Sequence, residues 1–141
     1  MIASIFSFLQ HIGFTHPLHP ALTHIPMGMV MGCFIFSGLA WMLKKPELHQ
    51  TANHCAVLGL VCRVPTVLAG LMDWQHRYGG QFEPLIITKM VLATILPALL
   101  SYAILLHRNA AEDKQRILVY GLCLLCAIGL GYCGGELVYG G

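Results

Sequence analysis

Residues 85–106 of the chain read LIITKMVLATILPALLSYAILL, an apolar run interrupted by a single charge, Lys89. A helix rises about 1.5 Å per residue, so about 20 apolar residues are enough to cross the hydrocarbon core of a bilayer. Three more stretches of this kind lie at residues 21–43, 54–72 and 117–134. The sequence therefore predicts four transmembrane helices.

The composition of the whole chain agrees with a membrane protein. Of its 141 residues, 57% are hydrophobic and 10% are charged, and the mean hydropathy is +0.71. Too few charged residues remain to cover an ordinary soluble surface. The connections between the predicted spans are short, about ten residues each, which favours antiparallel neighbours. We expect one all-α domain over residues 1–141, an integral-membrane four-helix antiparallel bundle.

The loops predict the orientation of this bundle. Lys and Arg gather in the first and third loops, and the second loop holds only Arg77. Because basic residues are retained on the cytoplasmic side, both termini are expected on the outer, periplasmic face of a bacterial inner membrane. Ahead of the first span, Ile2, Ile5 and Leu9 fall at helical spacing without a cleavage site behind them, which predicts a short interfacial helix rather than a signal peptide.

Histidine and proline mark the start of the first span. The segment from His16 to Pro26 reads HPLHPALTHIP. The predicted topology brings this segment to the same face as Asp73, Trp74 and His76 in the second loop and the final GGELVY stretch. Imidazole at a membrane boundary is typical of a metal or haem ligand, a proton-handling group or an amphipathic side chain at the headgroups. We therefore expect the polar features of the chain to converge at this face.

These motifs carry a family resemblance. The HPLHP segment, the LTHIP start of a membrane helix, Gly70-x-x-Asp73-Trp74 and the terminal GGELVY stretch together resemble an uncharacterised bacterial four-helix integral-membrane family, of the domain of unknown function 2231 type. The resemblance covers the chain from His16 to Tyr139. Some relatives are fused to Rieske iron–sulfur or c-type haem domains, so the resemblance implies, by association, a place in membrane electron transfer. Similar sequences often have a histidine where this chain has Lys89.

Four-helix membrane bundles hold haem b between facing helices, with an imidazole on each side of the iron. On the outer face, His24 is the first candidate ligand, with His76 or His19 opposite. On the inner face, His54 and His107 end adjacent antiparallel helices at similar depth, which suits a second haem. The alternative is that these histidines are ordinary interfacial residues at loop edges.

Charges inside the spans are the remaining candidates. Arg63 lies near the middle of the second span, where a guanidinium costs several kcal/mol unless it is paired or hydrated. A haem propionate, a lipid or quinone headgroup, or carbonyls freed near Pro65 would each pair with it, and backbone bonding is the plain structural alternative. Lys89 is expected to form a polar network with Asp73 and Glu136 on the outer side.

Two functions fit these patterns. The first is a small membrane subunit of a respiratory electron-transfer assembly: a b-type cytochrome with one or two haems that passes electrons between the quinone pool and an outer-face carrier, such as a c-type cytochrome or iron–sulfur protein. The second is a haem-free membrane anchor or assembly subunit whose His and charge cluster is structural or binds a metal. The chain offers no phosphate-cradling loop, no nucleophile with an evident base and no basic stripe for nucleic acid, so a self-contained enzyme is not expected.

Overall fold

The computed structural model describes residues 7, 11, 13, 18–77 and 79–139. Most of the segment predicted as an interfacial helix lies outside these residues, as does His16. The described residues form four α-helices: α2 (Leu18–Leu43), α3 (Glu47–Arg77), α4 (Pro84–Arg108) and α5 (Asp113–Tyr139). All four are long and apolar enough to cross a membrane. The prediction of an all-helical, four-span protein is therefore confirmed.

The boundaries of α3 differ most from the prediction. The apolar stretch was placed at 54–72, whereas the helix runs from Glu47 to Arg77. Its first two turns contain His49, Gln50 and Asn53, which are too polar to be counted as a span but are tolerated in a helix. Glu47 in the first turn also suits the positive end of the helix dipole. The first connection is correspondingly short.

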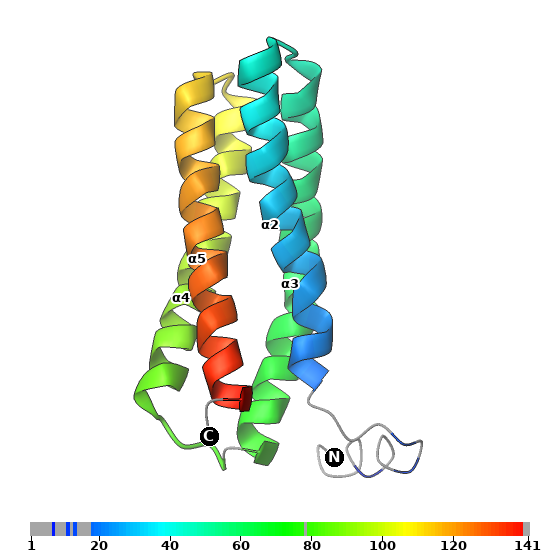
Figure 1. Cartoon of the computed structure of the whole chain (residues 1–141), viewed down its shortest axis with the longest axis vertical. Coiled ribbons are helices and arrows are strands. Elements are labelled where there is room, and N and C mark those ends of the chain that lie inside the picture. The colour runs from blue at the N-terminus through cyan, green and yellow to red at the C-terminus, as the bar shows by residue number, and fades with distance from the viewer. Residues whose placement is uncertain (1–6, 8–10, 12, 14–17, 78, 140–141) are drawn as a thin grey trace.

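The helices run up and down around a ring (Figure 1). The most extensive packing is between α2 and α3 and between α4 and α5; smaller contacts, α2 with α5 and α3 with α4, close the ring. We call the end with the α2–α3 and α4–α5 connections the loop end. The opposite end, with the start of α2 and the end of α5, is the motif end.

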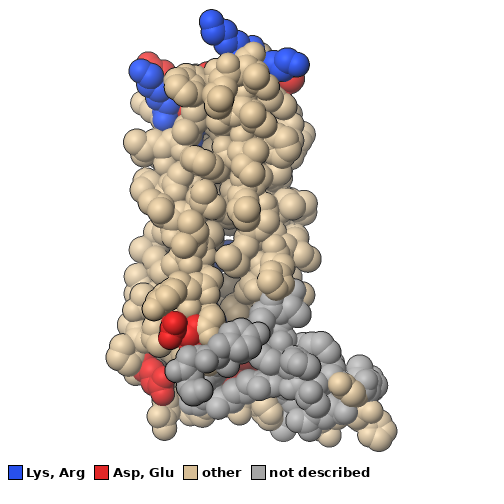
Figure 2. Space-filling model, in the orientation of Figure 1, with Lys and Arg blue, Asp and Glu red and all other residues tan. Residues whose placement is uncertain are grey.

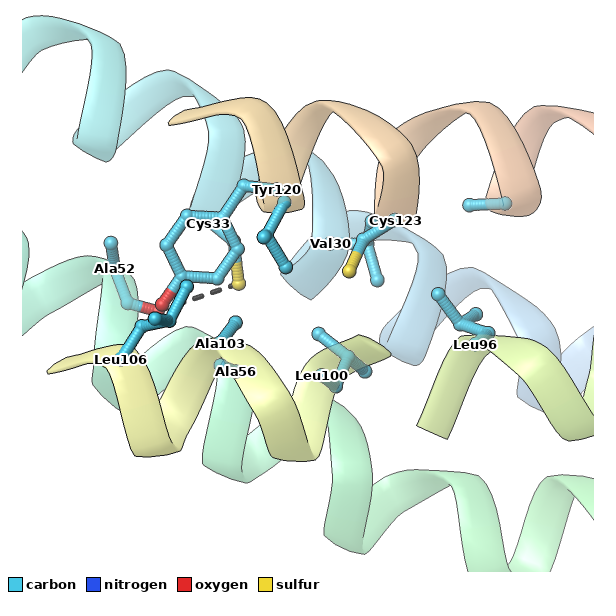
Figure 3. Close-up of a cluster of buried hydrophobic side chains, with 12 residues drawn as sticks. Val30, Cys33, Ala52, Ala56, Leu96, Leu100, Ala103, Leu106, Tyr120 and Cys123 are labelled. Carbon is cyan, nitrogen blue, oxygen red and sulfur yellow. Dashed lines mark hydrogen bonds between the residues drawn. The ribbon is translucent and has the colours of Figure 1, made fainter. Parts of the chain in front are cut away.

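The hydrophobic core fills the half of the bundle toward the loop end (Figure 3). Tyr120 and Leu100 are its largest buried side chains, and the Cys33 thiol donates a hydrogen bond of 3.4 Å to the Ala52 carbonyl. Toward the motif end the cluster stops at Leu96 on α4 and Ala127 on α5. We call the remaining half the motif half, and Figure 2 shows a hollow between the two helix pairs there.

Large apolar side chains cover the outside of every helix. Ile35, Leu58, Ile95 and Leu125 are examples, with 42–65% of their surface exposed. Burying them in lipid removes apolar surface from water, as a membrane location requires. Lys and Arg gather at the loop end (Figure 2), the end that the loop charges predict to be cytoplasmic. The orientation itself stays a prediction.

Glycines let α2 and α3 approach closely. A Cβ on Gly32 would lie 3.1 Å from the Cys55 sulfur, and one on Gly59 would lie 3.2 Å from the Met29 Cβ. Small residues allow such contacts between membrane helices, where packing drives association. By contrast, Gly28 has nothing within 4 Å of its Cβ position. The close packing therefore joins α2 and α3 into one unit that positions the polar residues of the motif end.

Candidate functional site

The first turn of α2 is capped by a residue from another helix. The backbone N–H of His19 donates to Asp73 Oδ2 of α3 at 2.8 Å, and Asp73 is only 5% exposed. The first N–H groups of a helix have no partner within it and carry a partial positive charge, so a carboxylate there is stabilising. Asp73 thereby fixes the start of α2 against the end of α3.

The His19 ring lies between α2 and α3. Its Nδ1 is 2.9 Å from the Thr66 carbonyl oxygen. Because a carbonyl oxygen only accepts, Nδ1 must carry the proton, and in the neutral ring Nε2 keeps the lone pair. Gly70 makes room for the ring, since a Cβ at that position would lie 2.8 Å from Nδ1. The half-buried imidazole is held in one tautomer, with the lone pair on Nε2.

Proline in α2 is accommodated by Thr66. Pro26 has no N–H and so leaves the Leu22 carbonyl without its helical partner. The Thr66 hydroxyl lies 3.3 Å from that carbonyl oxygen and 2.9 Å from the Cys62 carbonyl oxygen, to either of which it donates. The helix continues from Leu18 through Pro26, and the Thr66 hydroxyl of α3 lies beside the carbonyl that the proline leaves without its helical donor.

The surroundings favour neutral His19. Burial lowers the pKa of its imidazole, and the Lys89 ammonium lowers it further, while the Thr66 carbonyl and Asp73 act in the opposite direction. Lys89 itself lies 3.8 Å from the position of a Cβ on Gly134, near the end of α5. His19, Asp73 and Lys89 therefore lie within electrostatic reach of one another. Glu136, the third predicted member of the polar network, is exposed.

Trp74 stabilises the connection that follows this site. Its Nε1–H donates to the Gln81 carbonyl at 2.8 Å, and its ring centroid is 5.1 Å from that of Phe82. The Gly80 N–H also donates to the Trp74 carbonyl at 3.2 Å. Each residue of the Gly70-x-x-Asp73-Trp74 motif therefore has a structural role. Gly70 leaves room for the His19 ring, Asp73 caps α2, and Trp74 holds the α3–α4 connection.

The other predicted haem ligands differ from His19 in their burial or in their place along the bundle. His24, His54 and His76 are exposed. His107 is half-buried at the loop end, within electrostatic reach of His54, His49 and Arg116. The space between the helices there is filled by the core (Figure 3). Over the described part of the chain, no group of three or more His, Cys, Asp or Glu side chains is arranged to hold a metal ion.

The loop end contains a polar contact that the sequence did not reveal. His49 Nε2 lies 2.9 Å from Asp113 Oδ1, with His49 only 5% exposed. Arg116 lies 3.9 Å from the same carboxylate oxygen and donates to the Ala111 carbonyl at 2.6 Å. His49 was not among the residues predicted to form a site. Its spacing of three and seven residues from the buried Ala52 and Ala56 is the signal that places it inside the bundle.

Most of the chain matches a known family. A family model described as "Predicted membrane protein (DUF2231)" matches residues 15–141. No curated protein and no solved structure matches the chain. The matched range contains all four helices and every residue of the site at the motif end.

Proposed function

The chain belongs to the DUF2231 family of predicted membrane proteins, and from that premise we propose that it is the membrane subunit of a respiratory electron-transfer assembly, a small b-type cytochrome. The observation that carries the proposal is the geometry of His19. Its Nδ1–H is bonded to a backbone carbonyl, and its Nε2 keeps the lone pair. Metal-bound histidines usually have this arrangement, because the second bond orients the ring and raises its basicity as a ligand.

The motif half offers surroundings suited to a flat apolar group. The buried cluster of the core ends at Leu96 and Ala127, and the surface beyond it is hollowed between the helix pairs (Figure 2). Met27 of α2 reaches α5 in this half, where its Cε lies 3.0 Å from the Cβ position of Gly131. His19 would hold the iron there, and the bound haem would supply one-electron transfer. Asp73 contributes by holding the start of α2, and with it the imidazole, in place.

The proposal assigns one histidine ligand rather than two. His24 and His76, the predicted outer partners, are exposed on the bundle. A second haem between His54 and His107 would have to lie outside the core that fills the loop end. We therefore restrict the haem hypothesis to the motif half and to His19.

The motif end also suits exchange with partners. With the predicted orientation it faces outward, where a c-type cytochrome or iron–sulfur protein would take electrons that the chain receives from the quinone pool. Trp74 and the α3–α4 connection offer that partner an ordered surface beside the site. The proposed location is a bacterial inner membrane.

A second candidate is the haem-free membrane anchor. It is favoured by one observation: the hydrogen bonds of His19, Thr66 and Asp73 already explain these residues as a clasp between α2 and α3. Under this alternative Nε2 binds no metal, and the site serves only to hold the helix pair that a partner recognises.

Haem titration into the detergent-purified protein separates the two candidates. We expect a saturable Soret shift for the wild type and for His24→Gln, a matched control because His24 is an exposed histidine of the same helix. His19→Gln should lose the shift while its far-UV circular dichroism stays helical. Equal haem binding by all three proteins would exclude His19 as the ligand, and no binding by the wild type would favour the anchor.

A further inference from the structure

Arg63 belongs to the inward face of α3. The inward positions of this helix alternate in steps of three and four residues: His49, Ala52, Ala56, Gly59, Arg63, Thr66, Gly70 and Asp73. This spacing defines one stripe along a helix. Every other member is small or has a polar partner in the bundle. Arg63 is the long cationic side chain in the series, and it is half-buried.

The charge of Arg63 is not balanced within the described chain. Over residues 18–77 and 79–139, no hydrogen bond or ion pair is formed by its guanidinium, and no charged group acts on it from nearby. Asp73, the buried carboxylate among the described residues of the motif half, caps α2 and lies within electrostatic reach of Lys89. A guanidinium in the middle of a span costs several kcal/mol unless something pairs with it.

We propose that Arg63 binds the carboxylate of an apolar ligand that occupies the motif half. A guanidinium presents a planar set of donors that matches a carboxylate in a bidentate pair. The core closes the bundle toward the loop end, so the ligand enters from the motif end or from the lipid. Its apolar body fills the hollow between the helix pairs, and its carboxylate offsets the cation.

This inference rests on the proposed function where the ligand is haem, whose carboxylates are its propionates. Arg63 is one turn from Thr66, the residue bonded to the His19 ring, which places the two Cα atoms about 4.5 Å apart along the helix axis. A ligand held at His19 therefore lies beside the position from which Arg63 extends. A fatty acid also carries a carboxylate on an apolar body. The test must therefore distinguish a haem propionate from a fatty-acid carboxylate.

The test uses metal-free protoporphyrin IX, whose fluorescence reports binding without any contribution from iron. We expect the wild type in detergent to bind the free diacid at least about tenfold more tightly than the dimethyl ester, since the ester offers the guanidinium no charged acceptor. Arg63→Gln should lose this preference and Arg63→Lys should keep part of it. Arg108→Gln, which removes an exposed arginine at the loop end, is the control and should behave as the wild type.

A dansyl-labelled fatty acid and its methyl ester form the second arm. If the acid is preferred only among the fatty-acid probes, and the preference depends on Arg63, the site binds a lipid carboxylate. If the preference depends on Arg63 among the porphyrins, the site binds a propionate. Equal binding of acid and ester in both arms, absence of binding in both, or a preference that survives in Arg63→Gln overturns the inference. Because neither probe contains iron, these results test carboxylate binding by Arg63 independently of haem ligation by His19.

Unfolding of the ligand-free protein gives an independent readout. If Arg63 has no partner in the ligand-free protein, Arg63→Gln should leave the unfolding midpoint in sodium dodecyl sulfate unchanged or raise it. A structural arginine bonded to the backbone would give the opposite result, because its removal would leave buried carbonyls without donors. A lowered midpoint together with unchanged ligand binding would therefore assign Arg63 a structural role and refute the proposal.

Discussion

Substitution of Gly70 by alanine tests the contact between α2 and α3 at the site. A Cβ there would lie 2.8 Å from His19 Nδ1 and 3.1 Å from its Cε1, both of which are too close. The ring must move, which breaks the 2.9 Å bond from Nδ1 to the Thr66 carbonyl. Loss of that bond costs about 1 kcal/mol, and forcing a methyl group into a packed contact costs about 1–3 kcal/mol.

Helix propensity acts in the other direction. Alanine in a helix interior is favoured over glycine by about 0.5–1 kcal/mol, so the net loss of unfolding free energy should be about 1–3 kcal/mol. Gly38→Ala is the matched control, because nothing lies within 4 Å of its Cβ position in α2. That variant should gain the propensity term alone.

The assay is reversible unfolding in mixed micelles, followed by far-UV circular dichroism. We expect Gly70→Ala to unfold at a lower fraction of sodium dodecyl sulfate than the wild type and Gly38→Ala at the same or a higher fraction. Equal stabilisation by the two substitutions would refute the close approach of the His19 ring to Gly70.

Three further predictions concern the charges around the bundle ends. Asp73→Ala removes the cap on the His19 N–H and should lower the unfolding free energy by about 0.5–2 kcal/mol; an unchanged midpoint in the same micelle assay would contradict capping. The pKa of His19 is lowered in the folded protein, so its stabilising contribution is present above its unfolded pKa of about 6.5 and is lost as the pH falls through the folded value. The loss of stability between pH 8 and pH 5 should therefore be smaller in His19→Gln than in the wild type, and equal slopes would argue against the shift. Asp113→Ala leaves the buried His49 without its 2.9 Å partner and should cost about 1–3 kcal/mol, whereas Glu112→Ala, an exposed neighbour, should cost little.

The fold followed from the sequence because apolar runs long enough to span a bilayer permit little besides helices. The first turns of α3 were missed for the same reason, since His49 to Asn53 are helical but polar. Pro26 lies inside α2 without ending the helix. The Thr66 hydroxyl of α3 lies 3.3 Å from the Leu22 carbonyl that the proline frees, and nothing in the local sequence of α2 indicates that neighbour.

For the site, the sequence predicts which residues share one end of the bundle and not which of them touch. Asp73 and Lys89 were expected on one face with the histidine motif, because topology and loop charges alone suffice for that. Which histidine turns inward depends on the register between α2 and α3, which Gly70 and Asp73 set through contacts 47–54 residues apart in sequence. The preference for His24 over His19 was therefore beyond what spacing could decide. The His49–Asp113 contact likewise joins α3 to α5, which are not neighbours in the ring.

The most direct test of the central claim is a dithionite-reduced minus oxidised visible spectrum of the protein, purified from cells supplied with haem, together with a pyridine haemochrome count. The account predicts a reduced-minus-oxidised Soret difference and a pyridine haemochrome yield of about one haem per chain, from an iron held by His19, and the loss of both in His19→Gln. A featureless spectrum from well-folded wild-type protein would contradict it and assign the His19 site to the structure of a haem-free membrane subunit.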